Sequence, residues 1–137
     1  VASKGNEIKI KFYSGSKDGN LVNKESVDKA CGEGVDIVYH IAALVGPYHD
    51  REKYYAVNHQ GTKNLLDACQ NHKIFYFVYA SSPSTRFDGK DIKGKTEDAL
   101  SYPNEYVQLY AETKAAAERE VTRANCDSLL TISVAPH

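Results

Sequence analysis

Three short runs of β-branched and aromatic residues, separated by longer segments with helical periodicity, constrain the fold most strongly. The runs lie at Val35 to Ile41, Ile74 to Tyr79 and Leu129 to Val134. Helical patterns occupy Arg51 to Asn71 and the alanine-rich segment Glu105 to Asn125. Strands that alternate with helices form a parallel sheet, so we expect an α/β fold with helices on both faces. The run Val35 to Ile41 suits a strand that is buried on both sides.

Two further elements are expected nearer the N-terminus. Ile8 to Tyr13 alternates apolar and polar residues, which is typical of a half-buried strand. Asn23 can cap a short helix from Lys24 to Cys31. The expected order is therefore β-α-β-α-β-loop-α-β, in which Ser84 to Pro103 forms a long polar loop. Loops of this length in a compact domain are usually functional.

Composition excludes several classes of protein. The 137 residues suffice for one domain, with 42% hydrophobic residues and a net charge of -1. Nothing in the sequence suggests the basic patch of a nucleic-acid-binding protein or the run of about 20 apolar residues of a membrane span. Cys31, Cys69 and Cys126 are far apart and lack metal-ligand spacing, so we expect reduced thiols and no metal site.

Small and hydroxyl-bearing residues follow the predicted strands, at the edge where open α/β sheets bind ligands. Ala42 and Ala43 come after the first of the three runs and would let a cofactor approach the backbone closely. Ser81 and Ser82 follow the second run, and Pro136 follows the third. These positions define the predicted ligand-binding edge of the sheet.

Tyr110 and Lys114 lie four residues apart in the predicted long helix, which places both side chains on one helical face. A lysine ammonium beside a phenol favours the phenolate, and a phenolate can act as a general base toward an alcohol. The spacing alone carries little weight, because Tyr13 and Lys17 repeat it across a Gly/Ser turn, where it does not align the side chains. An isolated pair of this kind is most often a surface tyrosine beside a solvated lysine.

Four motifs in a fixed order give the pair its context: His40 to Ala43 (H-I-A-A), Val57 to Thr62 (V-N-H-Q-G-T), Tyr79 to Ser82 (Y-A-S-S) and Tyr110 to Glu118, which opens with Y-A-E-T-K. Together they resemble the extended short-chain dehydrogenase/reductase superfamily, over roughly residues 7 to 137. Within it, the loop from Phe87 to Pro103 is similar to that of the sterol-4-alpha-carboxylate 3-dehydrogenases and the related 3-beta-hydroxysteroid dehydrogenases.

The resemblance implies NAD-dependent oxidation of a 3-beta-hydroxyl on a sterol 4-carboxylate or a hydroxysteroid. Tyr110 would remove the hydroxyl proton, and Lys114 would hold the nicotinamide ribose and tune Tyr110. Ser82 would bind the substrate oxygen, with Ser84 as the alternative. In the sterol 4-carboxylate case, the resulting beta-keto acid would lose carbon dioxide. The residues implied to bind the cofactor or support its loops are Ala42, Ala43, Asn58, Ser81, Tyr110, Lys114 and Pro136.

The chain departs from the family pattern in ways that predict a partial domain. The family's Gly-x-x-Gly-x-x-Gly loop is absent, as are its first two strands and the substrate-binding lobe that would follow Pro136. We therefore expect residues 1–137 to form a partial Rossmann-like, doubly wound parallel sheet that lacks the first two strands, and the absence of methionine points the same way. Because that loop binds pyrophosphate in the family, we expect weak NAD binding or none, and NADP stays open as the alternative.

The resemblance also bears on partners and on competing functions. It implies a small-molecule sterol or steroid as substrate, no nucleic acid, and a place in the cytoplasm or on the cytosolic face of the endoplasmic reticulum. We keep a homodimer open, and any membrane association would come from segments outside this chain. An inactive truncated chain, a non-catalytic Rossmann-like binding domain and a nucleotide-sugar epimerase or dehydratase remain alternatives. The intact Tyr110 and Lys114 argue against the binding domain, and the Phe87 to Ile92 loop favours the sterol interpretation.

Overall fold

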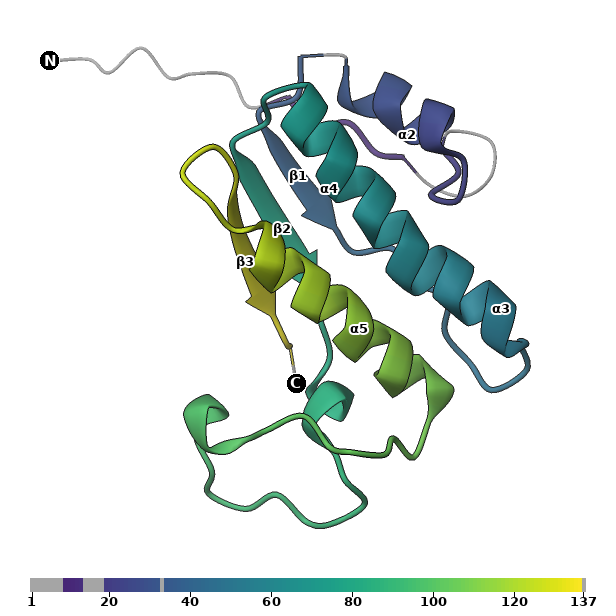
Figure 1. Ribbon diagram of the computed structural model, residues 1–137, viewed down its shortest axis with the longest axis vertical. Helices are drawn as coiled ribbons and strands as arrows, with labels where there is room; N and C mark the ends of the chain where they lie inside the picture. The colour runs from purple at the N-terminus through teal and green to yellow at the C-terminus, as the bar shows by residue number, and fades with distance from the viewer. Residues whose placement is uncertain (1–8, 14–18, 33, 137) are drawn as a thin grey trace, which may run out of the picture.

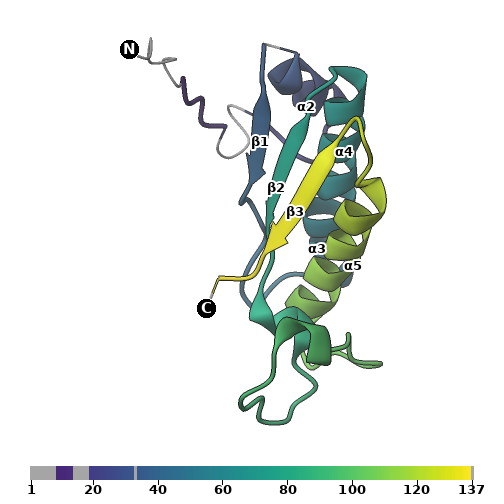
Figure 2. The same ribbon diagram turned by 90° about the vertical axis from the view of Figure 1, so that its left-hand side faces the viewer.

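A parallel three-stranded sheet forms the centre of the computed structural model, which describes residues 9–13, 19–32 and 34–136. Its strands are β1 (Ile37–His40), β2 (Tyr76–Ala80) and β3 (Leu130–Val134), hydrogen-bonded in the order β1-β2-β3. Because all three run in one direction, their carboxyl ends meet at a single edge (Figure 2). The three β-branched and aromatic runs are thereby confirmed as neighbouring parallel strands of an α/β fold.

The helices begin where local capping signals place them. In α2 (Lys24–Cys31), the Asn23 side chain accepts a hydrogen bond from the backbone N–H of Ser26, as the sequence predicts. Asp50 caps the next helical segment in the same way, through the N–H of Lys53. That segment runs continuously through α3 (Arg51–Tyr54), the π-helical η1 (Tyr55–Gln60) and α4 (Gly61–Asn71), and the last long helix is α5 (Leu109–Ala124).

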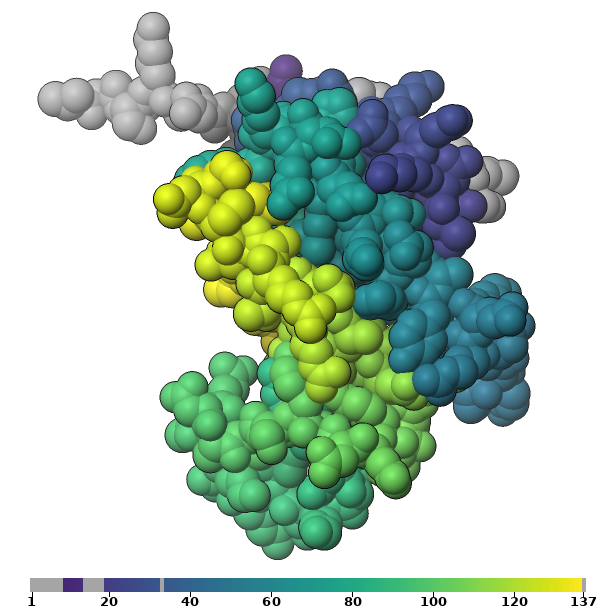
Figure 3. Space-filling view, in the orientation of Figure 1, coloured from purple at the N-terminus to yellow at the C-terminus, as the bar shows by residue number. Residues whose placement is uncertain are grey.

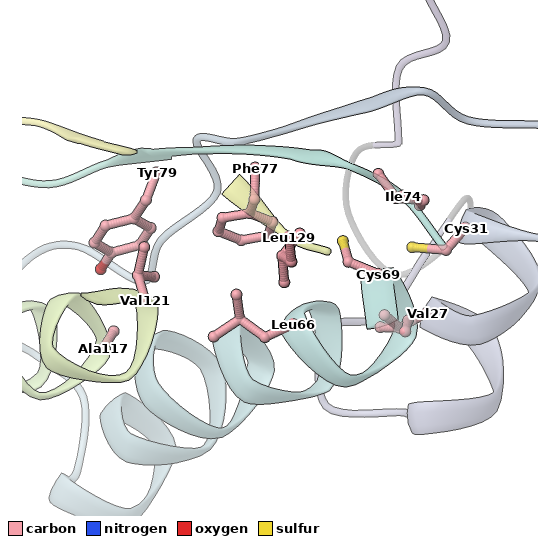
Figure 4. Packing of buried hydrophobic residues seen from close by; sticks show 11 residues of the cluster. Val27, Cys31, Leu66, Cys69, Ile74, Phe77, Tyr79, Ala117, Val121 and Leu129 are labelled. Atoms are coloured by element: carbon pink, nitrogen blue, oxygen red, sulfur yellow. The ribbon is translucent and has the colours of Figure 1, made fainter. Parts of the chain in front are cut away.

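The helices cover one face of the sheet and bury a single core between the two layers (Figures 1 and 2). Phe77 and Tyr79 of β2 point from the sheet toward α4 and α5, and both are fully buried (Figure 4). The core joins residues from α2, α4, α5 and the strands: Val27, Cys31, Leu66, Ala68, Cys69, Ile74, Phe77, Tyr79, Ala117, Val121 and Leu129. This packing fixes α5 against the end of β2, where the candidate site lies.

The opposite face of the sheet is open in the part of the chain that the structure describes. Tyr39 of β1 is 65% exposed, and Ile132 of β3 also faces outward. The expectation of helices on both faces therefore holds for one face only. The expectation that Val35 to Ile41 is buried on both sides is wrong for these residues, because no described element lies over alternate side chains of β1.

The expected strand at Ile8 to Tyr13 does not form across residues 9–13, which have no regular secondary structure. Ile10 is 70% exposed and Phe12 is 85% exposed, whereas Ile8 lies outside the described residues. An alternating pattern becomes a strand only when it joins a sheet, and the described sheet consists of β1, β2 and β3. The Gly/Ser turn with Lys17 also falls outside the described residues.

The predicted long helix begins later than its composition suggests. Gln108 has extended backbone (φ -133°, ψ 138°), so the helical hydrogen bonds start at Leu109 rather than at Glu105. The preceding loop contains two short 3-10 helices, η2 (Pro83–Arg86) and η3 (Glu97–Ala99), and forms the green lobe at one end of the molecule (Figure 3). Among the described residues, no helix has the length and apolar character needed to cross a membrane.

Gly61 allows a close approach between α4 and the segment before α2. A Cβ atom added at Gly61 would lie 2.8 Å from Cβ of Leu21, which is shorter than real carbon contacts. The approach is reinforced by Asn64, whose side-chain amide donates to the Leu21 carbonyl oxygen at 2.8 Å. The glycine of the V-N-H-Q-G-T motif is therefore explained by packing.

We predict that Gly61→Ala destabilises the protein by about 1 to 3 kcal/mol, because the added methyl group overpacks this contact. The sign is diagnostic, since Gly to Ala in an unconstrained helix stabilises by about 1 kcal/mol. Chemical denaturation would measure the free energy of unfolding, with Gln70→Ala at an exposed position of the same helix as the control. A stabilised Gly61→Ala variant would refute the packing explanation.

Candidate active site

Lys114 is the most tightly enclosed of the candidate residues. Its side chain is only 2% exposed, and its Nζ donates a hydrogen bond to the Ala80 carbonyl oxygen at 2.5 Å. The ammonium also lies 4.0 Å from the centre of the Tyr79 ring, a cation–π arrangement. Burial lowers the pKa of Lys114 to about 8, and the Glu118 carboxylate opposes that shift. The lysine thus fastens α5 to the carboxyl end of β2.

Tyr110 lies in the first turn of α5, one turn before Lys114, at the same edge of the sheet. Its side chain is partly exposed, and its hydroxyl makes no hydrogen bond to the described residues. The phenol is therefore accessible, while the lysine beneath it is fixed. The spacing of four predicts only a common helical face, and the different burial of the two side chains comes from the packing of α5 against β2.

The two candidate serines after β2 lie together. Ser82 is partly exposed and caps η2, where its Oγ accepts a hydrogen bond from the N–H of Ser84 at 3.3 Å. The hydroxyl oxygens of Ser82 and Ser84 are 2.8 Å apart, so a substrate oxygen that reached one would be near the other. The choice of Ser82 over Ser84 stays a prediction.

Ser81 has different surroundings from Ser82, although the two are adjacent. It is buried, its N–H donates to the Val134 carbonyl oxygen of β3 at 2.7 Å, and its hydroxyl donates to Glu118. Any contact of Ser81 with a cofactor would therefore fall to its carbonyl group. Pro136, which follows β3, is exposed near the same edge.

The segment after β1 is held by Asn58 of η1. The Asn58 side chain accepts from the N–H of Leu44 at 2.6 Å and donates to the Leu44 carbonyl oxygen at 3.0 Å. The same amide donates to the Thr113 hydroxyl of α5 at 3.1 Å. Ala42 is exposed and Ala43 is partly exposed just before this clamp. Asn58 therefore ties the small residues after β1 to the helix that carries Lys114.

His40 forms a buried hydrogen-bond chain at the end of β1. Its Nε2 lies 2.8 Å from the Thr62 hydroxyl, which itself donates to the Asn58 carbonyl oxygen at 2.7 Å. Because the single hydroxyl proton of Thr62 is used in that bond, Nε2 of His40 must be the donor. Burial, and to a lesser extent the Lys114 charge, lowers the pKa of His40 to about 3. The imidazole is neutral and structural.

Glu118 connects the site to the long loop, and the sequence interpretation gave it no role. It is 7% exposed, and it accepts hydrogen bonds from the hydroxyl of Ser81, from Arg86 at 2.6 Å and from Tyr102 at 3.0 Å. Burial alone would raise the pKa of Glu118, but these hydrogen bonds and the Arg86 charge hold it below its ordinary value. The available signal was its spacing, one helical turn after Lys114.

The parallel α/β sheet, with polar side chains gathered at its carboxyl edge, is a Rossmann-like arrangement. Residues 3–136 match the 3-beta hydroxysteroid dehydrogenase/isomerase family, and the chain belongs to that family. The predicted resemblance is thereby confirmed.

Curated relatives agree with this assignment. The chain is 38% identical over 126 residues to 2-alkyl-3-oxoalkanoate reductase of Shewanella oneidensis and 36% identical over 121 residues to human sterol-4-alpha-carboxylate 3-dehydrogenase, decarboxylating. Each alignment covers 87% of this chain and 32% of the relative. The chain thus spans about a third of the length of these relatives.

Solved structures show the same fold. A short-chain dehydrogenase/reductase superfamily protein from Agrobacterium tumefaciens with bound NAD superimposes with a TM-score of 0.72 at 28% identity, over 85% of this chain and 35% of that one. UDP-glucose 4-epimerase of Thermus thermophilus in complex with NAD gives a TM-score of 0.70 at 28% identity, over 85% of this chain and 38% of that one.

We predict that His40→Gln removes part of the acid sensitivity of the fold. The folded-state pKa of His40 is depressed from 6.5 to about 3, so between these values the unfolded chain takes up a proton that the folded chain refuses. Stability should fall as pH falls through this window, by at most about 1.4 kcal/mol per pH unit from this group. Gln can keep the donor to Thr62, and urea unfolding at several pH values should give a shallower slope for the variant. Equal slopes would show that His40 titrates normally.

Proposed function

We propose that this chain carries the catalytic residues of an NAD-dependent dehydrogenase that oxidises a 3-beta-hydroxyl group on a sterol 4-carboxylate or a hydroxysteroid. The observation that supports it most is the buried Lys114 ammonium, bonded to the Ala80 carbonyl oxygen at the strand end that bears Ser82. A surface lysine would indicate only a solvated pair. Burying an ammonium costs free energy unless it is bonded, so the arrangement suggests a specific use.

The residues at this edge fit a dinucleotide cofactor. Of the three N–H donors of Lys114, one is used by Ala80, which leaves two for hydroxyl groups such as those of a ribose. Ala42 and Ala43 present small side chains after β1, where a flat ring system could lie against the backbone. NAD, when bound, supplies the acceptor for a hydride. The NAD-bound structures with this fold support the choice, and NADP stays the alternative.

The protein's own residues would then handle the proton. Ser82, with Ser84 beside it, would hold the substrate hydroxyl by a hydrogen bond, and the Tyr110 oxygen would take its proton. The Lys114 charge would stabilise the phenolate from one turn below. Ala42, Ala43, Asn58, Ser81 and Pro136 would line or support the cofactor site. On a sterol 4-carboxylate, the 3-keto product is a beta-keto acid, which would lose carbon dioxide.

The relatives suggest which substrates to test first. The curated relatives include a human decarboxylating sterol-4-alpha-carboxylate 3-dehydrogenase and plant 3beta-hydroxysteroid-dehydrogenase/decarboxylases at 35 to 36% identity. The bacterial 2-alkyl-3-oxoalkanoate reductases suggest that an open-chain 3-hydroxy acid is the next substrate to test. UDP-glucose 4-epimerases share the fold, so a nucleotide sugar is the alternative from a different reaction class. A homodimer, and a cytoplasmic location or one on the cytosolic face of the endoplasmic reticulum, complete the proposal.

We predict that Tyr110→Phe lowers kcat for NAD-dependent oxidation by about 100- to 10,000-fold, the range for loss of a general base. NAD binding, measured by calorimetry, should change little, because the phenol oxygen is the only group removed. The assay should use the complete protein with a 3-beta-hydroxysteroid and follow NADH absorbance.

Tyr106→Phe is the matched control for this experiment. Tyr106 lies four residues before Tyr110, in the loop that precedes α5, and its hydroxyl is buried without a hydrogen-bond partner among the described residues. Its loss should therefore leave kcat within about twofold. Equal losses in both variants would contradict the role of Tyr110. Turnover of a UDP-sugar without net NADH would favour the epimerase instead.

A further inference from the structure

We propose that Glu118 is a positioning residue, which holds the Ser82-bearing strand end and the Lys114 ammonium in register with each other. This inference rests on the proposed function, because it names a residue that acts through the catalytic set. Glu118 itself is 7% exposed, and its carboxylate accepts hydrogen bonds from three donors.

The donors to Glu118 come from three separate segments of the chain. Ser81 is the first residue after β2, Arg86 ends η2, and Tyr102 lies at the end of the long loop. The Arg86 guanidinium also stacks over the Tyr102 ring at 3.7 Å. One carboxylate on α5 therefore fixes both ends of the loop that begins at the candidate serines.

Ser81, which donates to Glu118, is the sequence neighbour of the two residues whose bonds orient the site. Ala80, which accepts from Lys114, directly precedes Ser81, and Ser82 directly follows it. Ser82 is in turn held through η2, since its carbonyl oxygen accepts from the Thr85 hydroxyl at 2.8 Å. The hydrogen bond from Ser81 to Glu118 therefore fixes the positions of Ala80 and Ser82 relative to α5.

Glu118 also supplies the compensating charge for the buried ammonium. The titratable groups around Lys114 are His40 of β1, Tyr79 of β2, and Tyr110 and Glu118 of α5. His40 is neutral at ordinary pH, and burial raises the pKa of Tyr79, so both lack charge there. Glu118 is the carboxylate of this group, and its charge opposes the loss of the Lys114 proton that burial favours.

The test compares Glu118→Gln, Glu118→Asp and the control Glu120→Gln in the complete protein. Glu120 lies two residues further along α5 and pairs with Arg123 and with His59 of η1. Neither partner contacts Glu118, so replacing Glu120 changes the helix charge without removing a bond of the Glu118 network. The first readout is kcat for NAD-dependent oxidation as a function of pH. The second is the titration of the Lys114 Nζ signal by NMR with isotope-labelled lysine, assigned with Lys114→Gln.

We expect Glu118→Gln to lower kcat by about 10- to 100-fold, the loss that follows from a buried charged hydrogen bond. The alkaline limb of the kcat–pH profile and the titration of Lys114 should both move to lower pH by about one pH unit, because the compensating charge is gone. Glu118→Asp should keep the wild-type titration of Lys114, and Glu120→Gln should resemble the wild type in both readouts.

The two readouts separate this inference from the proposed function. An unshifted Lys114 titration in Glu118→Gln, or a loss of kcat with an unmoved alkaline limb, would overturn the positioning role and leave only a structural one. An inactive wild type would refute the proposed function. In that case the NMR titration still decides whether Glu118 sets the state of Lys114.

Discussion

The hydrogen bond from the Lys114 ammonium to the Ala80 carbonyl oxygen is the interaction on which the rest of the site depends. It joins α5 to the end of β2. Tyr110, one turn before Lys114, and Ser82, two residues after Ala80, therefore lie at the same edge of the sheet. The bond forms only because the core holds the helix against the strand, through fully buried residues such as Phe77 and Val121 (Figure 4). The positions of the candidate catalytic residues therefore depend on how the core packs around the buried Lys114 ammonium.

Much of this arrangement follows from local sequence signals. The Asn23 cap fixes α2, and the three β-branched runs become parallel strands because helices of suitable length separate them. The spacing of Tyr110 and Lys114 predicted their common face, and the order of four motifs predicted the family. These features could be predicted because each depends on residues a few positions apart, or on the alternation of strands and helices along the chain.

Other features depend on contacts between distant segments. The expected strand at residues 9–13 does not form, because alternation alone does not make a segment join the sheet. Gln108 has an extended backbone, so α5 begins at Leu109, and the residue type alone does not predict that conformation. Glu118 has the appearance of one more charge on a solvated helix face. Only the packing shows that Ser81, Arg86 and Tyr102 converge on it.

We propose that this site transfers hydride from C3 of a hydroxysteroid or sterol 4-carboxylate to NAD. The most direct measurement uses substrate deuterated at C3 with the complete protein, followed by mass spectrometry of the nicotinamide product. We expect one deuterium in each NADH formed, and a slower rate than with unlabelled substrate if hydride transfer limits turnover. NADH without deuterium, or no NADH from any 3-beta-hydroxy substrate, would contradict it.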